Sequence, residues 1–265
     1  MTASQTSNGD RAAANIALSV ILPTVGRPTL RRTLTSIRSQ RGGTSDVEVV
    51  VVADQGDNAA RQIFAEEAAG QPLWRFVEHA PTSGGFGYPQ RAHGIMVANG
   101  SYLLFIDDDD VYTPGAFAKI RSASAAHPGR ILIFRMDIQG IIRWKSPLLH
   151  QGNVGMEMVA IPNVPDRMGA FRPPLRYESD FDFIAETVAV QGDPVWRRDV
   201  IVVFNQPLQL DRPRTGGLLS RLLFQARTGI LFSPLRVRLR IGTRARSMRS
   251  RLGRAKEGDP ASGSP

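Results

Sequence analysis

Cysteine is absent from the 265 residues of this sequence, and no run of about 18 apolar residues occurs. The first absence excludes disulfide bonds and thiolate metal sites, and it agrees with a cytoplasmic protein. The second leads us to expect no membrane-spanning helix. Residues 1–15 also lack the charged start and apolar block of a secretory signal. We therefore expect a disordered lead-in there.

Acidic residues are absent from residues 212–256, where 13 of the 33 lysines and arginines lie. The rest of the chain holds 20 basic and 24 acidic residues, so the net charge of +9 comes from this segment. Apolar residues alternate there with arginines, which favours an anionic membrane surface over nucleic acid as the partner. We therefore expect residues 211–265 to form a basic amphipathic tail, partly disordered, and the protein to lie peripherally at the inner face of the membrane.

The first half of the sequence alternates short apolar runs with helical patterns. In those patterns apolar residues recur every three or four positions, and turn residues separate them from the runs. This alternation predicts an α/β fold with a Rossmann-like, mostly parallel sheet flanked by helices. The predicted strands are 18–23, 47–53, 73–77 and 102–106, and the predicted helices are 28–41, 59–69, 90–99 and 113–127.

The second half has a different pattern. A hairpin around Gly140 replaces the alternation, and a long segment rich in proline and glycine follows it. A loop of that length in a compact domain is typical of a functional segment. We expect one domain over residues 16–210. The predicted elements are strands at 131–134 and 138–144, a loop at 145–174, a helix at 177–190 and a strand at 200–204.

Four aspartates, Asp107–Asp110, follow the apolar run Tyr102–Ile106 directly. In open α/β sheets, ligands bind beyond the carboxyl ends of the strands, so these carboxylates fall where a site is expected. A bound divalent cation would relieve their mutual repulsion, and Mg²⁺ or Mn²⁺ prefers such oxygen ligands. The alternative is a solvated acidic turn that favours the N-terminus of the next helix.

Four segments taken together resemble family 2 glycosyltransferases of the GT-A fold. That family opens with an apolar strand into a proline turn and ends its second strand in aspartate. It then carries an Arg-Asn-x-Gly helix before an Asp-x-Asp-Asp site. The resemblance extends from residue 18 to about residue 182, with Ala92 in place of the family's asparagine. The matching segments are Ser19–Thr24, Val49–Asp54, Gln90–Ile95 and Phe105–Asp110.

The resemblance implies a hexosyltransferase-type enzyme that inverts the anomeric carbon. Its donor would be a nucleotide-diphospho-sugar, with a UDP-sugar favoured. Its acceptor would be a hydroxyl group of a glycan, a lipid-linked molecule or a small molecule. A divalent ion, Mg²⁺ or Mn²⁺, would neutralise the charge that grows on the leaving diphosphate. Residues 16–117 would form the nucleotide-sugar-binding half, and residues 130–205 the acceptor half.

The resemblance also implies roles for single residues on the donor side. Asp54 would accept a hydrogen bond from the base, although a carboxylate there can also cap a helix. Arg91 would face the base or the diphosphate, although it can also be a solvated helix charge. Because the four aspartates are consecutive, the alignment that assigns the metal ligands can shift by one residue. The implied donor-binding residues are Pro23, Thr24, Arg27, Asp54, Arg91, Asp107 and Asp108, and the implied metal ligands are Asp109 and Asp110.

The general base of the family is an aspartate at the start of a helix, preceded by glutamate. The segment Tyr177–Phe183 is similar and makes Asp180 the base, with Ser179 in the place of the glutamate. Glu178 is the alternative base. Without the resemblance, these carboxylates would be interpreted as the acidic first turn of a helix.

Two rival interpretations come from the same residues. Asp107-x-Asp109 after an apolar strand also resembles the nucleophile motif of haloacid-dehalogenase-like phosphatases, in which Asp107 would attack the phosphate. Three strand–helix units precede Asp107 here, whereas that motif usually lies near the start of its domain. The second rival is a non-catalytic protein that binds a membrane or nucleic acid through its basic tail.

Overall fold

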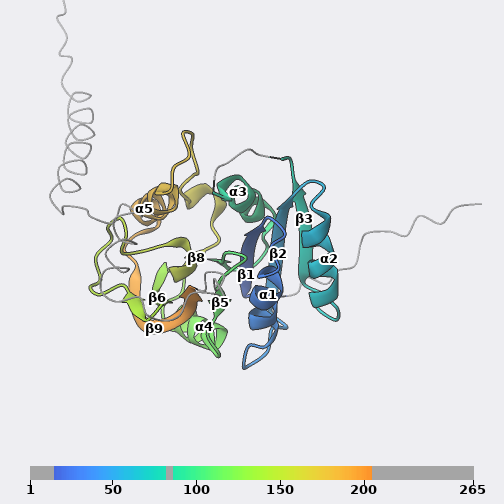
Figure 1. Cartoon of the computed structure of the whole chain (residues 1–265). Coiled ribbons are helices and arrows are strands. Elements are labelled where there is room, and N and C mark those ends of the chain that lie inside the picture. The colour runs from blue at the N-terminus through green and yellow to red at the C-terminus, as the bar shows by residue number, and fades with distance from the viewer. Residues whose placement is uncertain (1–14, 82–85, 205–265) are drawn as a thin grey trace, which may run out of the picture. The chain divides into compact units, whose positions relative to one another are not determined.

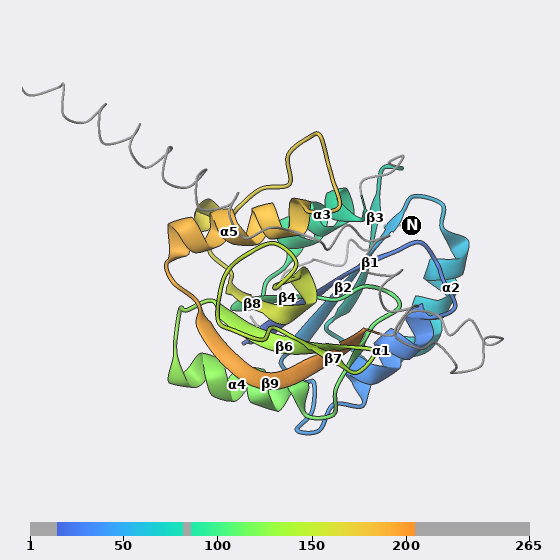
Figure 2. The same ribbon diagram turned by 60° about the vertical axis from the view of Figure 1, so that its left-hand side comes forward.

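A computed structural model describes residues 15–81 and 86–204 of the chain. Residues 1–14 of the predicted lead-in 1–15 lie outside the described residues, and so does the whole of the predicted basic tail 211–265. The described part forms one nine-stranded sheet with helices on both faces. Figures 1 and 2 show α1 and α4 on one face, and α3 and α5 on the other. Among the described residues, no helix has the length and apolarity needed to cross a lipid bilayer.

The sheet runs in the order β3-β2-β1-β4-β8-β6-β9-β5, with β7 paired to β6. Strand β1 pairs in parallel with β2 and β4, whereas β8 is antiparallel to both of its neighbours. The strands are β1 (Leu18–Thr24), β2 (Val47–Asp54), β3 (Trp74–His79), β4 (Tyr102–Phe105), β5 (Val111–Tyr112), β6 (Leu132–Ile138), β7 (Ile141–Arg143), β8 (Val159–Pro162) and β9 (Val195–Phe204). The helices are α1 (Leu30–Arg38), α2 (Asn58–Glu67), α3 (Tyr88–Val97), α4 (Ala116–Ala126) and α5 (Ser179–Gln191).

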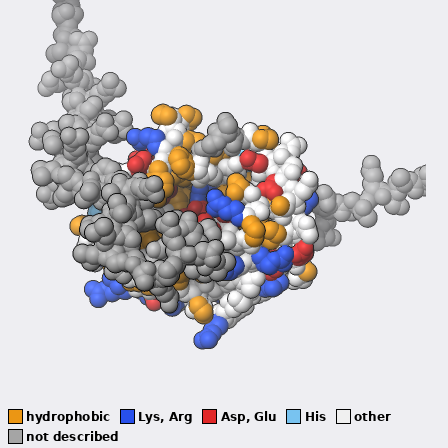
Figure 3. Space-filling model, viewed as in Figure 1, with side chains coloured by type: hydrophobic (Ala, Val, Ile, Leu, Met, Phe, Trp, Pro, Cys, Tyr) orange, Lys and Arg blue, Asp and Glu red, His pale blue; other side chains and the backbone are white. Residues whose placement is uncertain are grey.

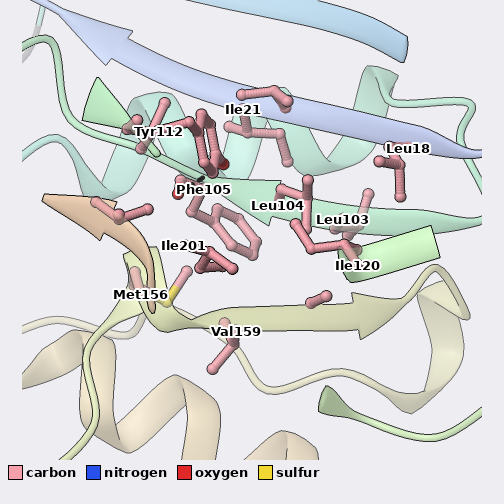
Figure 4. Close-up of a cluster of buried hydrophobic side chains, with 14 of the residues drawn as sticks. Leu18, Ile21, Leu103, Leu104, Phe105, Tyr112, Ile120, Met156, Val159 and Ile201 are labelled. Carbon is pink, nitrogen blue, oxygen red and sulfur yellow. Dashed lines mark hydrogen bonds between the residues drawn. The ribbon is translucent and has the colours of Figure 1, made fainter. Parts of the chain in front are cut away.

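The core lies along the central strands. All residues of β1 and β4 are buried, as parallel strands covered on both faces require. Phe105 of β4 lies between Ile21 of β1 and Ile201 of β9 (Figure 4). Helix α3 approaches β1 closely because its Gly94 has no side chain: a Cβ atom there would lie 2.5 Å from the side chain of Ile21.

The parallel sheet that the alternating pattern predicts is confirmed, and so is the hairpin. Two expectations were wrong. The helix predicted over 113–127 begins only at Ala116, after Gly115, whose φ is +80°. The predicted loop 145–174 contains β8, a central strand that pairs with β4 and β6. The apolar run of β8 has only four residues, which is too short to be recognised as a strand in a segment rich in proline.

The topology brings several functional candidates to one edge of the sheet. Strands β1, β2 and β4 are parallel, so their carboxyl ends, which carry Thr24, Asp54 and Asp107, meet at that edge. The chain then returns to the sheet as β5, which pairs with β9. The acidic segment therefore lies between the end of β4 and the second half of the fold.

Candidate active site

Asp108 is held by the turn that follows β1. Its carboxylate accepts hydrogen bonds from Thr24 Oγ1 at 2.8 Å, from Val25 N at 3.3 Å and from Arg27 Nη1 at 3.1 Å. Burial nevertheless raises the pKa of Asp108, and these donors oppose the rise. The structure therefore brings Thr24, Arg27 and Asp108 together as the sequence predicted.

Arg27 also joins two of the aspartates. The same Nη1 atom lies 3.1 Å from Asp108 and 3.1 Å from Asp109. Burial and the charges of Asp107 and Asp108 raise the pKa of Asp109. One half-exposed guanidinium thus faces several crowded carboxylates, which is an environment that favours a further positive charge.

The four aspartates differ in their access to a metal ion. The side chain of Asp107 is 41% exposed and that of Asp109 is 16% exposed, whereas Asp110 is 1% exposed. No set of three or more acidic or histidine side chains within the described ranges is placed to hold a metal ion. A divalent cation held by two carboxylates and the phosphates of a substrate still fits, because Mg²⁺ is commonly bound in this way.

Asp54 contacts a helix side chain and does not cap a helix. Its Oδ1 atom accepts a hydrogen bond of 2.5 Å from Gln90 Nε2 of α3, while Asp57 caps α2. Pro23 is buried beneath the start of the same helix, so it supports this corner without lining it. Gln90 is a residue that the sequence did not single out, because a glutamine in a helix has many ordinary roles.

Arg91 is buried and not a solvated helix charge, because only 4% of its side chain is exposed. Its guanidinium pairs with Asp107 through Nη2 and donates from Nη1 to the backbone oxygen of Phe86 at 2.8 Å. Nη2 also lies 3.9 Å from Glu157 Oε1. The guanidinium carbon is 5.5 Å from the centre of the Tyr88 ring. Arg91 therefore connects the acidic strand end to the second half of the domain.

Asp180 lies in the first turn of α5, as predicted for the base. Burial raises its pKa to about 6, and Phe181 N, which donates to Asp180 Oδ1 at 2.6 Å, opposes the rise. The charge of Arg91 also lowers this pKa, and that of Asp107 raises it. Glu178 immediately precedes the helix and is half-buried. A carboxyl group that titrates near neutrality suits proton transfer at cellular pH.

Glu157 is a further member of this cluster, and the sequence analysis missed it. It lies in a single 3₁₀ turn, Met156–Met158, just before β8. Burial and the charge of Asp107 raise the pKa of Glu157 well above its usual value. Glutamate between two buried methionines was the only signal, and it fell within a segment predicted to be a loop.

The candidate residues gather on one face of the described domain. Figure 3 shows acidic and basic side chains next to one another near the middle of this face, with hydrophobic side chains beside them. The cluster draws on the turn after β1, the ends of β2 and β4, the start of α3, the 3₁₀ turn before β8 and the start of α5. Six segments from both halves of the sequence thus build one site.

Comparison with known proteins identifies a family. The profile of glycosyl transferase family 2 matches residues 19–178, which is more than half of the chain. The match includes the strand ends, α3 and the acidic segment, and it ends two residues before Asp180. A search of curated proteins found no match.

Solved structures share the fold at low sequence identity. The crystal structure of residues 1–349 of S. aureus TarS has a TM-score of 0.59 and 20% identity, over 72% of this chain and 61% of that one. The same fragment in complex with UDP-GlcNAc has a TM-score of 0.58 and 21% identity, over 71% and 58%. The mannosyltransferase PcManGT from Pyrobaculum calidifontis, in complex with GDP-Man and Mn²⁺, has a TM-score of 0.55 and 18% identity, over 72% and 57%. This chain spans about three fifths of the length of these structures.

Proposed function

Because the chain belongs to glycosyl transferase family 2, we propose that it transfers a sugar from a nucleotide-diphosphate donor to an acceptor hydroxyl group. The observation that carries this proposal is the position of Arg91. One buried guanidinium pairs with Asp107 at the end of β4 and approaches Glu157 of the second half. Donor and acceptor would meet at this side chain.

The donor would lie along the edge where the parallel strands end. Asp54 keeps its second carboxylate oxygen, Oδ2, for a base N–H, because Gln90 donates to Oδ1. A uracil imide can supply that N–H, so we favour a UDP-sugar. Asp107 and Asp108, with Thr24 and Arg27 around Asp108, would receive the ribose and the sugar diphosphate. The solved structures with UDP-GlcNAc and GDP-Man support a donor of this class.

We assign the metal to Asp107 and Asp109, the more exposed carboxylates, and Asp110 is disfavoured because it is buried. This choice differs from the pair of metal ligands that the resemblance implies, Asp109 and Asp110. A divalent ion, Mg²⁺ or Mn²⁺, would neutralise the negative charge that develops on the leaving diphosphate. The Mn²⁺ in the PcManGT complex supports the use of a divalent ion.

Asp180 would act as the general base, with Glu178 as the alternative. Its carboxylate would take the proton of the acceptor hydroxyl while that oxygen attacks the anomeric carbon. The bond to the diphosphate breaks on the opposite face, so the configuration inverts in one displacement. A base with a pKa of about 6 is ionised at cellular pH and still basic enough to help the attack.

The location and the tail remain part of the proposal. We place the enzyme in the cytoplasm at an anionic membrane surface, bound through the basic segment 211–265, with a glycan, lipid-linked or small-molecule acceptor. The charge of that segment in the sequence supports this placement. Binding to anionic vesicles, compared between the full chain and a chain ending at residue 210, tests it.

The test of the activity is thermal unfolding with UDP, GDP, dTDP or CMP, each with and without Mn²⁺. A ligand that binds only the folded state raises the melting temperature. We expect one nucleotide to do so in a metal-dependent manner, and Asp109→Ala to abolish the rise. No rise with any nucleotide would contradict the proposal. Turnover of a generic phosphate ester, with Asp107 trapped as phospho-aspartate, would instead support the phosphatase.

A further inference from the structure

Two large aromatic side chains are exposed beside the candidate base. Phe86 is 59% exposed and Tyr177 is 66% exposed. Their rings pack edge to face, with centroids 6.2 Å apart, although 91 residues separate them in the sequence. Single exposed apolar residues are ordinary, but a contacting pair beside a catalytic cluster marks a binding surface.

Both residues are held in place by their backbones. Arg91 donates to the backbone oxygen of Phe86 at 2.8 Å, and the hydroxyl group of Tyr88 donates to that of Tyr177 at 2.8 Å. Phe86 has a φ of +53°, a left-handed conformation that phenylalanine rarely adopts. Such strain is typical of functional sites, where the surrounding contacts maintain it. The backbones that carry the two rings are therefore held in place before any ligand arrives.

A column of aromatic rings connects this pair to the hydrophobic core. Phe86 contacts Tyr88, which stacks on Phe171 at 5.0 Å, and Phe171 stacks on the buried Phe183 at 4.6 Å. Rings at the end of such a column cannot move into the core, because the space is already filled. Their exposed faces therefore remain available to a ligand.

The pair lies close to the reacting groups. Tyr177 immediately precedes Glu178 and lies three residues before Asp180, the candidate base at the start of α5. Phe86 is joined to the same cluster through Arg91, which pairs with Asp107. A molecule on these rings would therefore reach both the donor and the base.

The combination of rings and carboxylates selects one class of ligand. A hydrocarbon chain could pack against the rings. It would also exclude water from the carboxylates of Asp180 and Glu157 and would offer them no hydrogen bonds in return. A phosphate would be repelled by the same carboxylates. A sugar ring offers an apolar C–H face to an aromatic ring, and hydroxyl groups at its edge that donate to carboxylates.

We propose that Phe86 and Tyr177 form a stacking platform for a sugar ring of the acceptor, one hydroxyl group of which faces Asp180. This inference rests on the proposed transferase function and gives its acceptor a chemical class. The acceptor would therefore be a molecule that ends in a sugar. Simple alcohols and molecules that end in a phosphate would not bind at this platform.

Saturation-transfer NMR on the full-length protein tests this proposal without knowledge of the natural acceptor. The protein is first loaded with Mn²⁺ and the nucleotide that raises its melting temperature. The probes are the methyl glycosides of glucose, galactose, mannose and N-acetylglucosamine, together with 1-octanol and glycerol 3-phosphate. We expect saturation of at least one methyl glycoside, strongest on the C–H groups of one face.

The variants separate stacking from other effects. Phe86→Ala and Tyr177→Ala should each raise the dissociation constant of that glycoside about two- to tenfold. Tyr177→Phe, which keeps the ring, should restore most of the affinity even if an alanine variant folds poorly. Met96→Ala, which removes an 81% exposed side chain from α3, serves as the control and should change nothing.

Several results would overturn the inference. Saturation of no methyl glycoside would do so, and so would glycoside binding that neither alanine variant weakens. Binding of 1-octanol or glycerol 3-phosphate with the same dependence on the two rings would assign the surface to a lipid or a phosphate. A protein that binds nucleotide but no glycoside loses only this inference, whereas one that binds no nucleotide loses the proposed function as well.

Discussion

Arg91 and Phe86 are joined by a hydrogen bond of 2.8 Å from the guanidinium Nη1 to a backbone oxygen. The same guanidinium pairs with Asp107. A buried cation thus fixes a strained loop residue and an active-site carboxylate at once. The first prediction concerns the loss of this cation.

Arg91→Met should destabilise the protein by about 1–3 kcal/mol, because the Phe86 backbone oxygen and the Asp107 carboxylate lose the hydrogen bonds that Arg91 donates. For a domain of this size the melting temperature should fall by roughly 5 °C. Arg91→Lys keeps the charge but cannot hold Phe86 and Asp107 together, so transfer should fall more than stability. Arg61→Met, which removes an exposed arginine over the Phe76 ring, is the control and should cost little. Equal melting temperatures for Arg91→Met and Arg61→Met would contradict this prediction.

The rate of transfer should depend on the ionisation of Asp180. Burial raises its pKa to about 6, and only the ionised form accepts a proton. We expect kcat/KM to fall tenfold per pH unit below about pH 6 and to be flat just above it. Asp180→Asn should lower the rate by about 10²- to 10⁴-fold and leave nucleotide binding intact. Release of nucleoside diphosphate between about pH 4.5 and 8 provides the measurement, and a rate that stays constant down to about pH 4.5 would exclude Asp180 as the base.

The same pKa makes Asp180 a cost to stability at neutral pH. A folded-state pKa above the unfolded value of 3.8 means that the folded protein holds the proton more tightly. This contribution is complete below pH 3.8 and is lost as pH rises through about 6. Asp180→Asn, which cannot ionise, should therefore stabilise the protein at pH 7.5 by up to about 3 kcal/mol. Melting curves at pH 7.5 and pH 4 measure this, and the gain should vanish at pH 4.

The exposed Asp182 of the same helix provides the control for that comparison. Asp182→Asn should not stabilise the protein at pH 7.5, because its carboxylate pairs with Arg176 in solvent. A similar gain from both substitutions would show that the effect comes from the charge of the helix and not from the burial of Asp180.

Recognition of the base should depend on Asp54 and on its partner. Asp54→Asn should weaken nucleotide binding by roughly tenfold or more, because it removes a charged acceptor. Gln90→Ala should weaken it less, since it leaves the Asp54 carboxylate in place and removes a side chain that orients it. Asp46→Asn is a matched control, because Asp46 precedes β2 at the opposite edge of the sheet and pairs with Arg121. Calorimetric titration with the nucleotide measures all three, and an unchanged affinity in Asp54→Asn would remove this residue from the base site.

The aspartates that bind the metal can be identified by mutation, because the four side chains differ in their exposure. Asp107→Ala and Asp109→Ala should abolish the binding of Mn²⁺ in the presence of the nucleotide, and EDTA should stop transfer. Asp110→Asn should bind Mn²⁺ normally, because that side chain is buried. Electron paramagnetic resonance of Mn²⁺ distinguishes bound from free metal. Loss of binding in both Asp109→Ala and Asp110→Asn, with normal binding in Asp107→Ala, would return the metal site to Asp109 and Asp110.

The donor half of the site could be predicted from the sequence because its residues follow strong local patterns. Asp54 and Asp107 end apolar runs, and parallel strands bring such ends to one edge. The regular alternation of strands and helices also predicted the parallel part of the sheet. Arg91 was identified by the family resemblance, but its burial depends on packing between α3 and residues more than 60 positions away.

The acceptor half could be predicted only in part. Asp180 was found through the resemblance, whereas Glu157 and Phe86 have no pattern around them. Strand β8 was missed because an antiparallel strand of four residues has too few positions for a period to appear. Its insertion between β4 and β6 is what places Glu157 beside Arg91, so one missed strand concealed one site residue.

The proposed donor contacts come from the ends of core strands, whereas the proposed acceptor platform comes from residues outside regular elements. Phe86 precedes α3 and Tyr177 precedes α5. Substitutions at the strand ends change residues next to the buried sheet, whereas substitutions at these two positions change exposed rings. Acceptor preference can therefore diverge between relatives, or be redesigned in the laboratory, while the scaffold that recognises the nucleotide stays unchanged.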